Sequence, residues 1–204
     1  MGVYRKLVVP RLCDFAMRSE RLFAYRERTI AAATGRVLEI GAGAGCNLRH
    51  YPPQVREVLA LEPDRRLIRM ARRRRGQFCG RLTYLESSAE AIPLGDQSVD
   101  TVVSTWTMCT IPHVRRALLD VRRVLVPGGR LLFVEHGLSP EPYIRKWQYR
   151  VDPLWARLSG GCHLDRPIQA LIEGAGFAIE PLRTGYMSGP KLMTFLYEGA
   201  ARPL

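Results

Sequence analysis

Three glycines at alternate positions, Gly41, Gly43 and Gly45, follow directly after a short apolar stretch that contains one acid, Glu39. Glycine permits a tight turn and lets a bound molecule approach the backbone closely. The spacing differs from the dinucleotide fingerprint, whose sixth position holds Gly or Ala and is Cys46 here. The Gly-Lys-Ser/Thr ending of a phosphate-binding loop is also absent. A carboxylate beside the loop would repel a pyrophosphate and would suit a ligand that carries an ammonium group.

A second acid, Glu62, ends the next apolar stretch, residues 57–62. At the end of a strand in a nucleotide-binding fold, a carboxylate accepts hydrogen bonds from ribose hydroxyls. Together the two acids indicate a nucleoside with a positively charged, amino-acid-like end. S-adenosylmethionine (SAM) meets both requirements.

The elements that must position these residues alternate between strands and helices. Such alternation gives right-handed crossovers and a parallel sheet with helices on both faces. We therefore predict an α/β fold in one domain, 1–204, with an N-terminal helical segment at 1–34. The predicted strands are 36–40, 57–62, 81–87, 98–106, 130–137, 177–184 and 191–199. The predicted helices are 3–33 with an interruption at Pro10, 46–51, 65–75, 114–125 and 168–177, and residues 138–165 are predicted to be irregular.

Six motifs in order resemble those of the class I SAM-dependent methyltransferases. They are "VLEIGAGAG", "LALEPD", "ESSAEAIPL", "SVDTVVSTWTMCTI", "VRRVLVPGGRLLFVEHG" and "GAGF", and they lie within residues 36–197. The resemblance implies a Rossmann-like fold with a seven-stranded, mostly parallel sheet. It also implies that SAM is the cofactor and S-adenosylhomocysteine the product.

The same resemblance implies which residues bind the cofactor. The methionine moiety would lie against the glycine loop and the ribose against Glu62. The adenine would lie beside Pro63 and Asp64 and near Ser88, which stands where the family usually has Asp. The expected cofactor-binding residues are Glu39, Gly41, Ala42, Gly43, Gly45, Asn47, Glu62, Pro63, Ser88, Ala89, Ser104, Thr105 and Trp106.

The segment 138–166 contains "WQYRVDPLWARLSGGCHLDR" and resembles the acceptor-site insertion of the methyltransferase-like alkyl thiol methyltransferases and their bacterial relatives. A thiol acceptor must become a thiolate, so groups that accept a proton are catalytic candidates: His136, His163 and Asp165. Similar sequences also include quinone C-methylases and phospholipid N-methyltransferases, so these acceptors stay open. The residues expected to wall an apolar acceptor pocket are Tyr143, Trp147, Tyr149 and Trp155.

Composition bears on the remaining alternatives. The chain has 31 basic and 19 acidic residues and a net charge of +12, which fits an anionic partner such as nucleic acid or a membrane surface contacted by the basic N-terminal segment. The fourth strand ends in "STWT" and not in the Asn/Asp-Pro-Pro-Tyr/Phe motif of enzymes that methylate base amino groups, so we expect a small-molecule acceptor and no nucleic-acid partner. The oligomeric state stays open.

Cysteine usage and the N-terminus indicate the compartment. The five cysteines, at 13, 46, 79, 109 and 162, form no C-x-x-C pair, so their spacing predicts neither a metal site nor a disulfide framework. The N-terminus has no long apolar region of a signal peptide, and the apolar anchor of the mammalian relatives has no counterpart. We therefore expect a cytoplasmic protein.

Overall fold

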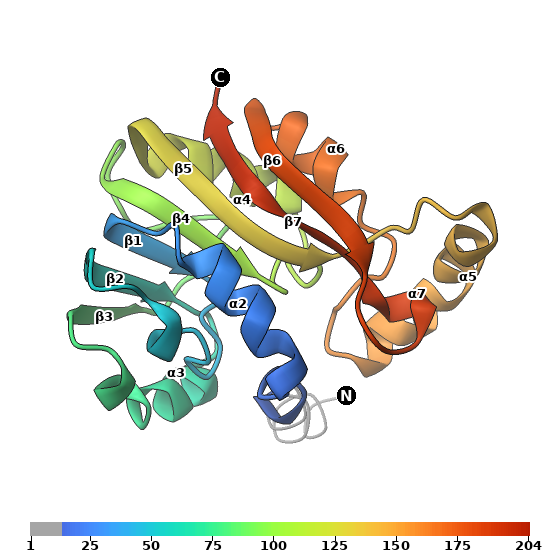
Figure 1. Ribbon diagram of the computed structural model, residues 1–204, viewed down its shortest axis with the longest axis horizontal. Helices are drawn as coiled ribbons and strands as arrows, with labels where there is room; N and C mark the ends of the chain where they lie inside the picture. Colours follow the sequence, from blue (N-terminus) through green and yellow to red (C-terminus); the bar gives the residue numbers. More distant parts are fainter. Residues whose placement is uncertain (1–13) are drawn as a thin grey trace.

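The structure of the chain, a computed structural model, describes residues 14–204 and has a central twisted sheet flanked by helices (Figure 1). The strands are β1 (Gly35–Ile40), β2 (Val55–Leu61), β3 (Arg81–Leu85), β4 (Val99–Thr105), β5 (Leu125–His136), β6 (Phe177–Tyr186) and β7 (Phe195–Pro203). The helices are α2 (Phe23–Ile30), α3 (Arg65–Arg72), α4 (Val114–Val124), α5 (Pro142–Leu158), α6 (Ile168–Glu173) and α7 (Lys191–Thr194), with short 3-10 turns at Glu20–Leu22, Leu48–His50 and Arg75–Gln77.

The seven strands form one sheet in the order β3-β2-β1-β4-β5-β7-β6. The first five strands pair in parallel, and β7 lies antiparallel between β5 and β6. The prediction of a seven-stranded, mostly parallel sheet is therefore confirmed.

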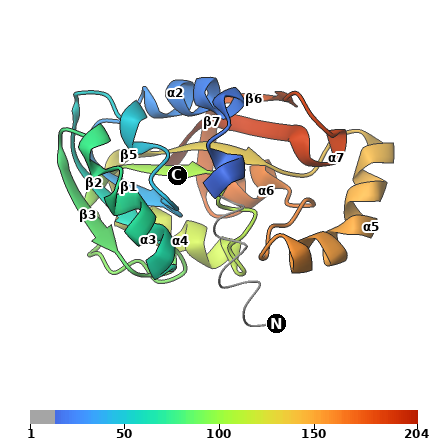
Figure 2. The ribbon, with the colours of Figure 1, turned by 90° about the horizontal axis from the view of Figure 1, so that it is seen from below.

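Each central strand supplies apolar side chains to both faces of the sheet, as expected for strands covered on two sides. On β1, Val37 packs with Ile30 of α2, while Leu38 packs in the larger cluster that contains Leu118 of α4 and Ile172 of α6. Figure 2 shows α2 on one side of the sheet and α4 and α6 on the other. Helices cover both faces, as predicted.

The parallel arrangement brings the carboxyl ends of β1, β2, β4 and β5 to one edge of the sheet. The strand order reverses between β1 and β4, because β2 and β3 lie to one side of β1 and the later strands to the other. Open α/β sheets bind their ligands at such a switch point. In Figure 1 the arrowheads of β1, β4 and β5 point toward the end of the molecule where α5 lies.

The prediction that residues 138–165 are irregular is wrong, because helix α5 occupies 17 of these residues. The pattern misleads since the helix turns polar residues inward: Gln148 and Asp152, four positions apart, are buried, while Tyr149 is 52% exposed. Pro153 lies on the exposed side of the helix and lacks the N–H for one helical hydrogen bond. The two fully buried side chains of this helix are polar, and its apolar residues on the same side, Ile144, Val151 and Trp155, are only half-buried.

Other predicted bounds also differ from the structure. Strand β5 begins at Leu125 and not at 130, and helix α6 ends at Glu173 and not at 177. The helix expected at 46–51 is only a 3-10 turn, Leu48–His50. The final strand begins at Phe195 and not at 191, because Pro190 starts a short helical turn. The helix 3–33 is broken at Ser19, and its residues 1–13 with Pro10 lie outside the described part of the chain. Among residues 14–204, no helix is both long enough and apolar enough to cross a bilayer.

Candidate active site

The glycine loop after β1 uses its three glycines for different reasons. A Cβ on Gly41 would lie 2.3 Å from Cγ2 of Thr107, and one on Gly45 would lie 3.1 Å from the Cβ of Ala71 in α3. Close packing therefore requires these two glycines. A Cβ on Gly43 would meet only the carbonyl oxygen of Gly41, at 3.9 Å, so the space above Gly43 is open. Only Gly43 leaves room for a ligand at the backbone.

Glu62 lies directly after β2, opposite this open position. Its Oε2 accepts a hydrogen bond from the N–H of Gly43 at 3.0 Å, and its Oε1 accepts one from the N–H of Asp64 at 2.9 Å. The side chain is 6% exposed, and burial raises the pKa of the carboxyl. Each oxygen keeps lone-pair capacity for a further donor, as binding of a ribose diol requires.

Glu39, near the end of β1, has partners within the protein. Its Oε1 accepts a hydrogen bond from Nδ2 of Asn47 at 2.9 Å, and its Oε2 accepts one from the Tyr51 hydroxyl at 2.7 Å. Burial raises its pKa to about 7, although the Tyr51 hydrogen bond and the charge of Arg26 oppose the rise. Glu39 thus anchors the network that shapes the glycine loop.

Arg26 of α2 is a site residue that the sequence analysis missed. Its Nη1 donates to Oδ1 of Asn47 and, at 3.1 Å, to Oγ1 of Thr105. Its guanidinium lies 4.9 Å from the centre of the Trp106 ring. The side chain is 3% exposed, and burial lowers its pKa. No sequence signal distinguishes this arginine from the many others in the chain.

The Nε of Arg26 is buried and has no hydrogen-bond partner among the described residues. A buried N–H without an acceptor costs free energy, and an acceptor on a ligand would recover it. The carboxylate of an amino-acid-like ligand would supply this acceptor.

Ser104 and Trp106, at the end of β4, lie differently from expectation. The Ser104 hydroxyl donates to Oε1 of Glu135 at 2.7 Å. Glu135 also accepts the N–H groups of Thr107 and Met108, and burial raises its pKa to about 7. Trp106 has a positive φ of 50°. Ser104 therefore supports the loop after β4, while the Trp106 ring stacks on the arginine.

The adenine end of the expected site contains residues with structural partners. Asp64 caps α3, since its Oδ1 accepts the N–H of Arg66 at 2.7 Å, while Pro63 is exposed. Ser88 forms a short turn in which its hydroxyl oxygen accepts the N–H of Glu90 at 3.2 Å, and Ala89 is buried in the core. These residues follow β2 and β3, so they border the same edge of the sheet.

Two of the three catalytic candidates, His163 and Asp165, lie together with Asp152 of α5. The Nδ1 of His163 lies 2.8 Å from Oδ2 of Asp152, whose Oδ1 accepts the N–H of Leu164. Burial raises the pKa of Asp165, and the charge of Asp152 adds to the rise. With its proton on Nδ1, His163 presents the Nε2 lone pair as a base.

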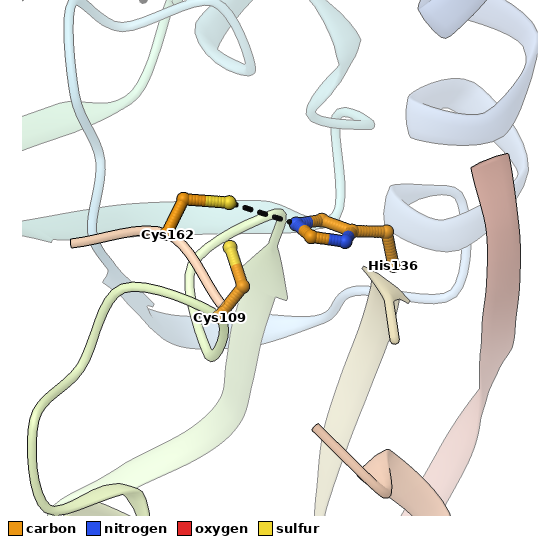
Figure 3. Close-up of side chains that lie close together, drawn as sticks. All are labelled: Cys109, His136 and Cys162. Atoms are coloured by element: carbon orange, nitrogen blue, oxygen red, sulfur yellow. Dashed lines mark hydrogen bonds between the residues drawn. The ribbon is translucent and has the colours of Figure 1, made fainter. Parts of the chain in front are cut away.

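His136, the last residue of β5, belongs to a second cluster with Cys109 and Cys162, and the three side chains point toward one another in Figure 3. Its Nε2 lies 3.2 Å from Sγ of Cys162. Hydrogen bonding with Cys109 and then with His136 lowers the pKa of the Cys162 thiol. Burial opposes protonation of His136, but Cys162 raises the pKa of the imidazole above its ordinary value.

The aromatic residues expected to wall a pocket separate into two groups. Tyr143, Trp147 and Tyr149 are 70%, 39% and 52% exposed, so they face solvent from α5 and enclose nothing. Trp155 is half-buried. Together with Cys109 and His136, its indole lowers the pKa of the Cys162 thiol. His113 is exposed at the start of α4, and His50 is half-buried against the Phe23 ring.

The fold, the open glycine and the Glu62 carboxylate fit SAM. A family model described as "Methyltransferase domain" matches residues 38–133. The human thiol S-methyltransferase TMT1A is 33% identical over 174 residues, which cover 81% of this chain and 69% of TMT1A. This chain belongs to the class I SAM-dependent methyltransferases, whose cofactor is SAM.

Other relatives extend the comparison. The rat thiol S-methyltransferase TMT1B is 35% identical, over 70% of this chain and 59% of its own length. The ubiquinone/menaquinone biosynthesis C-methyltransferase UbiE of Methylobacterium nodulans is 29% identical, over 72% of this chain and 57% of its length. The chain thus spans somewhat more than half of these proteins. A solved SAM-dependent methyltransferase from Thermotoga maritima has the same fold, with a TM-score of 0.70, 20% identity and 98% coverage of both chains.

Proposed function

We propose that this chain methylates a small thiol, with SAM as methyl donor. The observation that carries the proposal is the His163–Asp152 pair, because His163 is fastened to the loop after β4 through its N–H bond to the carbonyl oxygen of Cys109. The similarity to the thiol S-methyltransferases TMT1A and TMT1B supports the choice of acceptor.

Bound SAM supplies an electrophilic methyl group on a sulfonium. Glu62 would hold the ribose hydroxyls, and Arg26 would hold the methionine carboxylate. Nε2 of His163 removes the proton of the acceptor thiol, whose pKa in water is about 8.5. The thiolate would then accept the methyl group, and S-adenosylhomocysteine would be the leaving group. Asp152 stabilises the imidazolium that results.

The test is release of S-adenosylhomocysteine with aliphatic thiols, an aryl thiol, a quinol, phosphatidylethanolamine vesicles and bulk RNA as acceptors. His163→Gln should lower turnover of an aliphatic thiol about 100-fold or more at neutral pH, the range of general-base catalysis. An aryl thiol ionises without help, so its loss should be much smaller. Equal losses for both thiols would contradict a role as base. His113→Gln, at an exposed histidine, is the matched control.

Asp152→Asn tests the orientation of the base. An amide nitrogen at this position would donate to Nδ1 and move the imidazole proton to Nε2, which removes the accepting lone pair. Turnover should fall as far as in His163→Gln, with SAM affinity unchanged. Wild-type turnover in Asp152→Asn would show that the pair is structural.

The similarity to UbiE supports C-methylation of a quinol as a second candidate. Release with the quinol and with no thiol in the panel would favour it. The expected cytoplasmic location stays a prediction.

A peripheral contact with an anionic membrane is the second part of the proposal. The membrane contact expected from the N-terminal segment lies largely in residues 1–13, which are outside the described part of the chain. Helix α5 offers another surface, because basic and aromatic side chains share its exposed side, as in interfacial helices. Co-sedimentation with anionic but not with neutral vesicles, weakened in Trp147→Ala, is the expected result. Equal sedimentation of both proteins would remove α5 from the contact. The exposed residues are Tyr143, Arg145, Lys146, Trp147, Tyr149 and Arg150.

A further inference from the structure

Three side chains that could ligate a metal meet beside the His163–Asp152 pair, although no two of them are close in the sequence. Cys109 lies in the loop after β4, His136 ends β5, and Cys162 lies in the loop after α5 (Figure 3). Their ligand atoms, two sulfurs and one imidazole nitrogen, all lie within 4.8 Å of one another. Cysteine spacing alone predicts no metal site here, because C-x-x-C pairs are a feature of local sequence.

We propose that Cys109, His136 and Cys162 bind one Zn²⁺ ion. Zinc prefers thiolate sulfur and imidazole nitrogen in a tetrahedral arrangement, with bonds of about 2.3 Å to sulfur and about 2.0–2.1 Å to nitrogen. These bond lengths place ligand atoms about 3.6–3.8 Å apart. Nε2 of His136 and Sγ of Cys162 are 3.2 Å apart, so a small outward shift of Cys162 accommodates the ion.

The surrounding structure holds the ligands in place. The N–H of His163 donates to the carbonyl oxygen of Cys109 at 2.9 Å, which fastens the loop after α5 to the loop after β4. The hydroxyl of Ser159 donates to the carbonyl oxygen of Cys162 at 3.2 Å. The Glu135 carboxylate accepts hydrogen bonds from the N–H groups of Thr107 and Met108, which fixes the start of the loop that contains Cys109. A preformed site loses little conformational freedom when the ion binds.

The coordination number points to a zinc ion with an open position. Among the described residues, no fourth His, Cys, Asp or Glu joins the three ligands. Structural zinc sites have four protein ligands, whereas catalytic sites have three and leave one position for water or substrate. Cys109 and His136 are buried, while Cys162 is half-exposed, so the accessible side of the cluster is that of Cys162.

The open position suits the thiol acceptor, an extension that rests on the proposed function. Zinc binding releases the thiol protons of Cys109 and Cys162 to solvent. The acceptor thiol then replaces the metal-bound water: its S–H bond breaks, a zinc–sulfur bond forms, and the proton moves to Nε2 of His163. An electron pair of the bound sulfur forms the bond to the methyl carbon. The product, a neutral thioether, is a weaker ligand for zinc and leaves.

The environment of Nδ1, the second ring nitrogen of His136, predicts that zinc binds with moderate affinity. Metal-bound histidines usually donate their other N–H to a carboxylate or carbonyl, and loss of that partner weakens binding about 10–100-fold. Nδ1 of His136 is buried and has no partner among the described residues. The zinc should therefore be removable by a chelator without unfolding the protein.

The experiment measures metal binding separately from catalysis. The purified full chain, freed of metal by a chelator, is titrated with Co²⁺ as a spectroscopic substitute for Zn²⁺. Thiolate-to-cobalt charge-transfer absorption and the intense visible bands of tetrahedral cobalt are the expected result. Zinc should displace the cobalt at one ion per chain.

Cys162→Ser should weaken cobalt binding at least about 100-fold, beyond the effect of losing an outer partner. Cys109→Ala is the second variant, in case one substitution disturbs folding, and circular dichroism checks both. Cys79→Ser, at an exposed cysteine, should bind as the wild type does. Absence of the charge-transfer band in the wild type, or its persistence in both variants, would overturn the site.

Adding an acceptor thiol to the cobalt protein should increase the charge-transfer absorption, because a third thiolate joins the metal. Metal binding without turnover of any thiol would leave the zinc site standing and contradict the proposed function. Equal thiol turnover by metal-free and zinc-loaded protein would support the proposed function and contradict thiol activation by zinc.

Discussion

Replacement of the Glu62 carboxylate by an amide tests the cofactor site most directly. In Glu62→Gln one carboxylate oxygen becomes an NH₂ group that faces a backbone donor, either the N–H of Gly43 or that of Asp64. The amide nitrogen accepts no hydrogen bond, so one ribose hydroxyl loses its acceptor and the other keeps a neutral one.

The expected loss of SAM affinity follows from these contacts. Hydrogen bonds to charged groups contribute about 1.5–3 kcal/mol each, and those to neutral groups about 0.5–1.5 kcal/mol. Loss of one charged bond and weakening of the second sum to about 3 kcal/mol, which corresponds to a dissociation constant raised about 100-fold. Stability should change less, because the substitution also removes a buried carboxylate whose ionisation is already disfavoured.

Isothermal titration with S-adenosylhomocysteine gives the affinity without turnover, and circular dichroism confirms the fold. Glu86→Gln is the matched control, since Glu86 is an exposed acid just after β3 that pairs with Arg65. The control should bind as the wild type does. The expected rise in the dissociation constant is about 100-fold. A folded Glu62→Gln protein that binds S-adenosylhomocysteine within about threefold of the wild-type affinity would therefore refute our assignment of Glu62 to the ribose.

Three further predictions follow from the same network. Arg26→Met should weaken binding of SAM more than that of an analogue without the carboxylate, and equal losses in two titrations would contradict the arginine–carboxylate contact. Gly41→Ala and Gly43→Ala should both lose stability, because each places a side chain at a positive φ. Gly41→Ala should lose about 1–3 kcal/mol more through its clash with Thr107, while Gly43→Ala should also reduce SAM affinity; urea unfolding and titration separate the two effects. Between about pH 5 and pH 7 the native state holds protons on Glu39 and Glu135 that the unfolded chain has lost. As the pH rises through this range the free energy of unfolding should fall, and the contribution of Glu135 is up to about 1.4 kcal/mol per pH unit. Glu135→Gln should remove this contribution, and an unchanged pH slope in urea unfolding would show that Glu135 stays ionised.

Much of the scaffold follows from the local sequence. Val37 and Leu38, or Val102 and Val103, are adjacent apolar residues that face opposite sides of the sheet, and such runs are typical of parallel strands covered on both faces. Glycines after β1 and an acid after β2 predict a strand end that binds a nucleoside. Periodicity and residue type are local properties, so they can be read without knowledge of the fold.

Helix α5 shows where local pattern is insufficient. Its buried side chains include Gln148 and Asp152, whose partners are backbone groups of other segments and, for Asp152, the His163 ring as well. An apolar stripe reveals the buried face of a helix, but polar anchoring has no such periodicity. The same limit applies to Arg26, which resembles any surface arginine until Asn47 and Thr105 surround it.

The sequence by itself determined the order of the strands along the chain, the glycine loop and the two acids that indicate SAM. Only the tertiary structure decided which side chains meet: Arg26 with the end of β4, His163 with Asp152, and Cys162 with Cys109 and His136. The physical reason is that the ends of parallel strands and the loops between them converge from positions far apart in the sequence. Chemistry that depends on such convergence leaves no spacing to recognise.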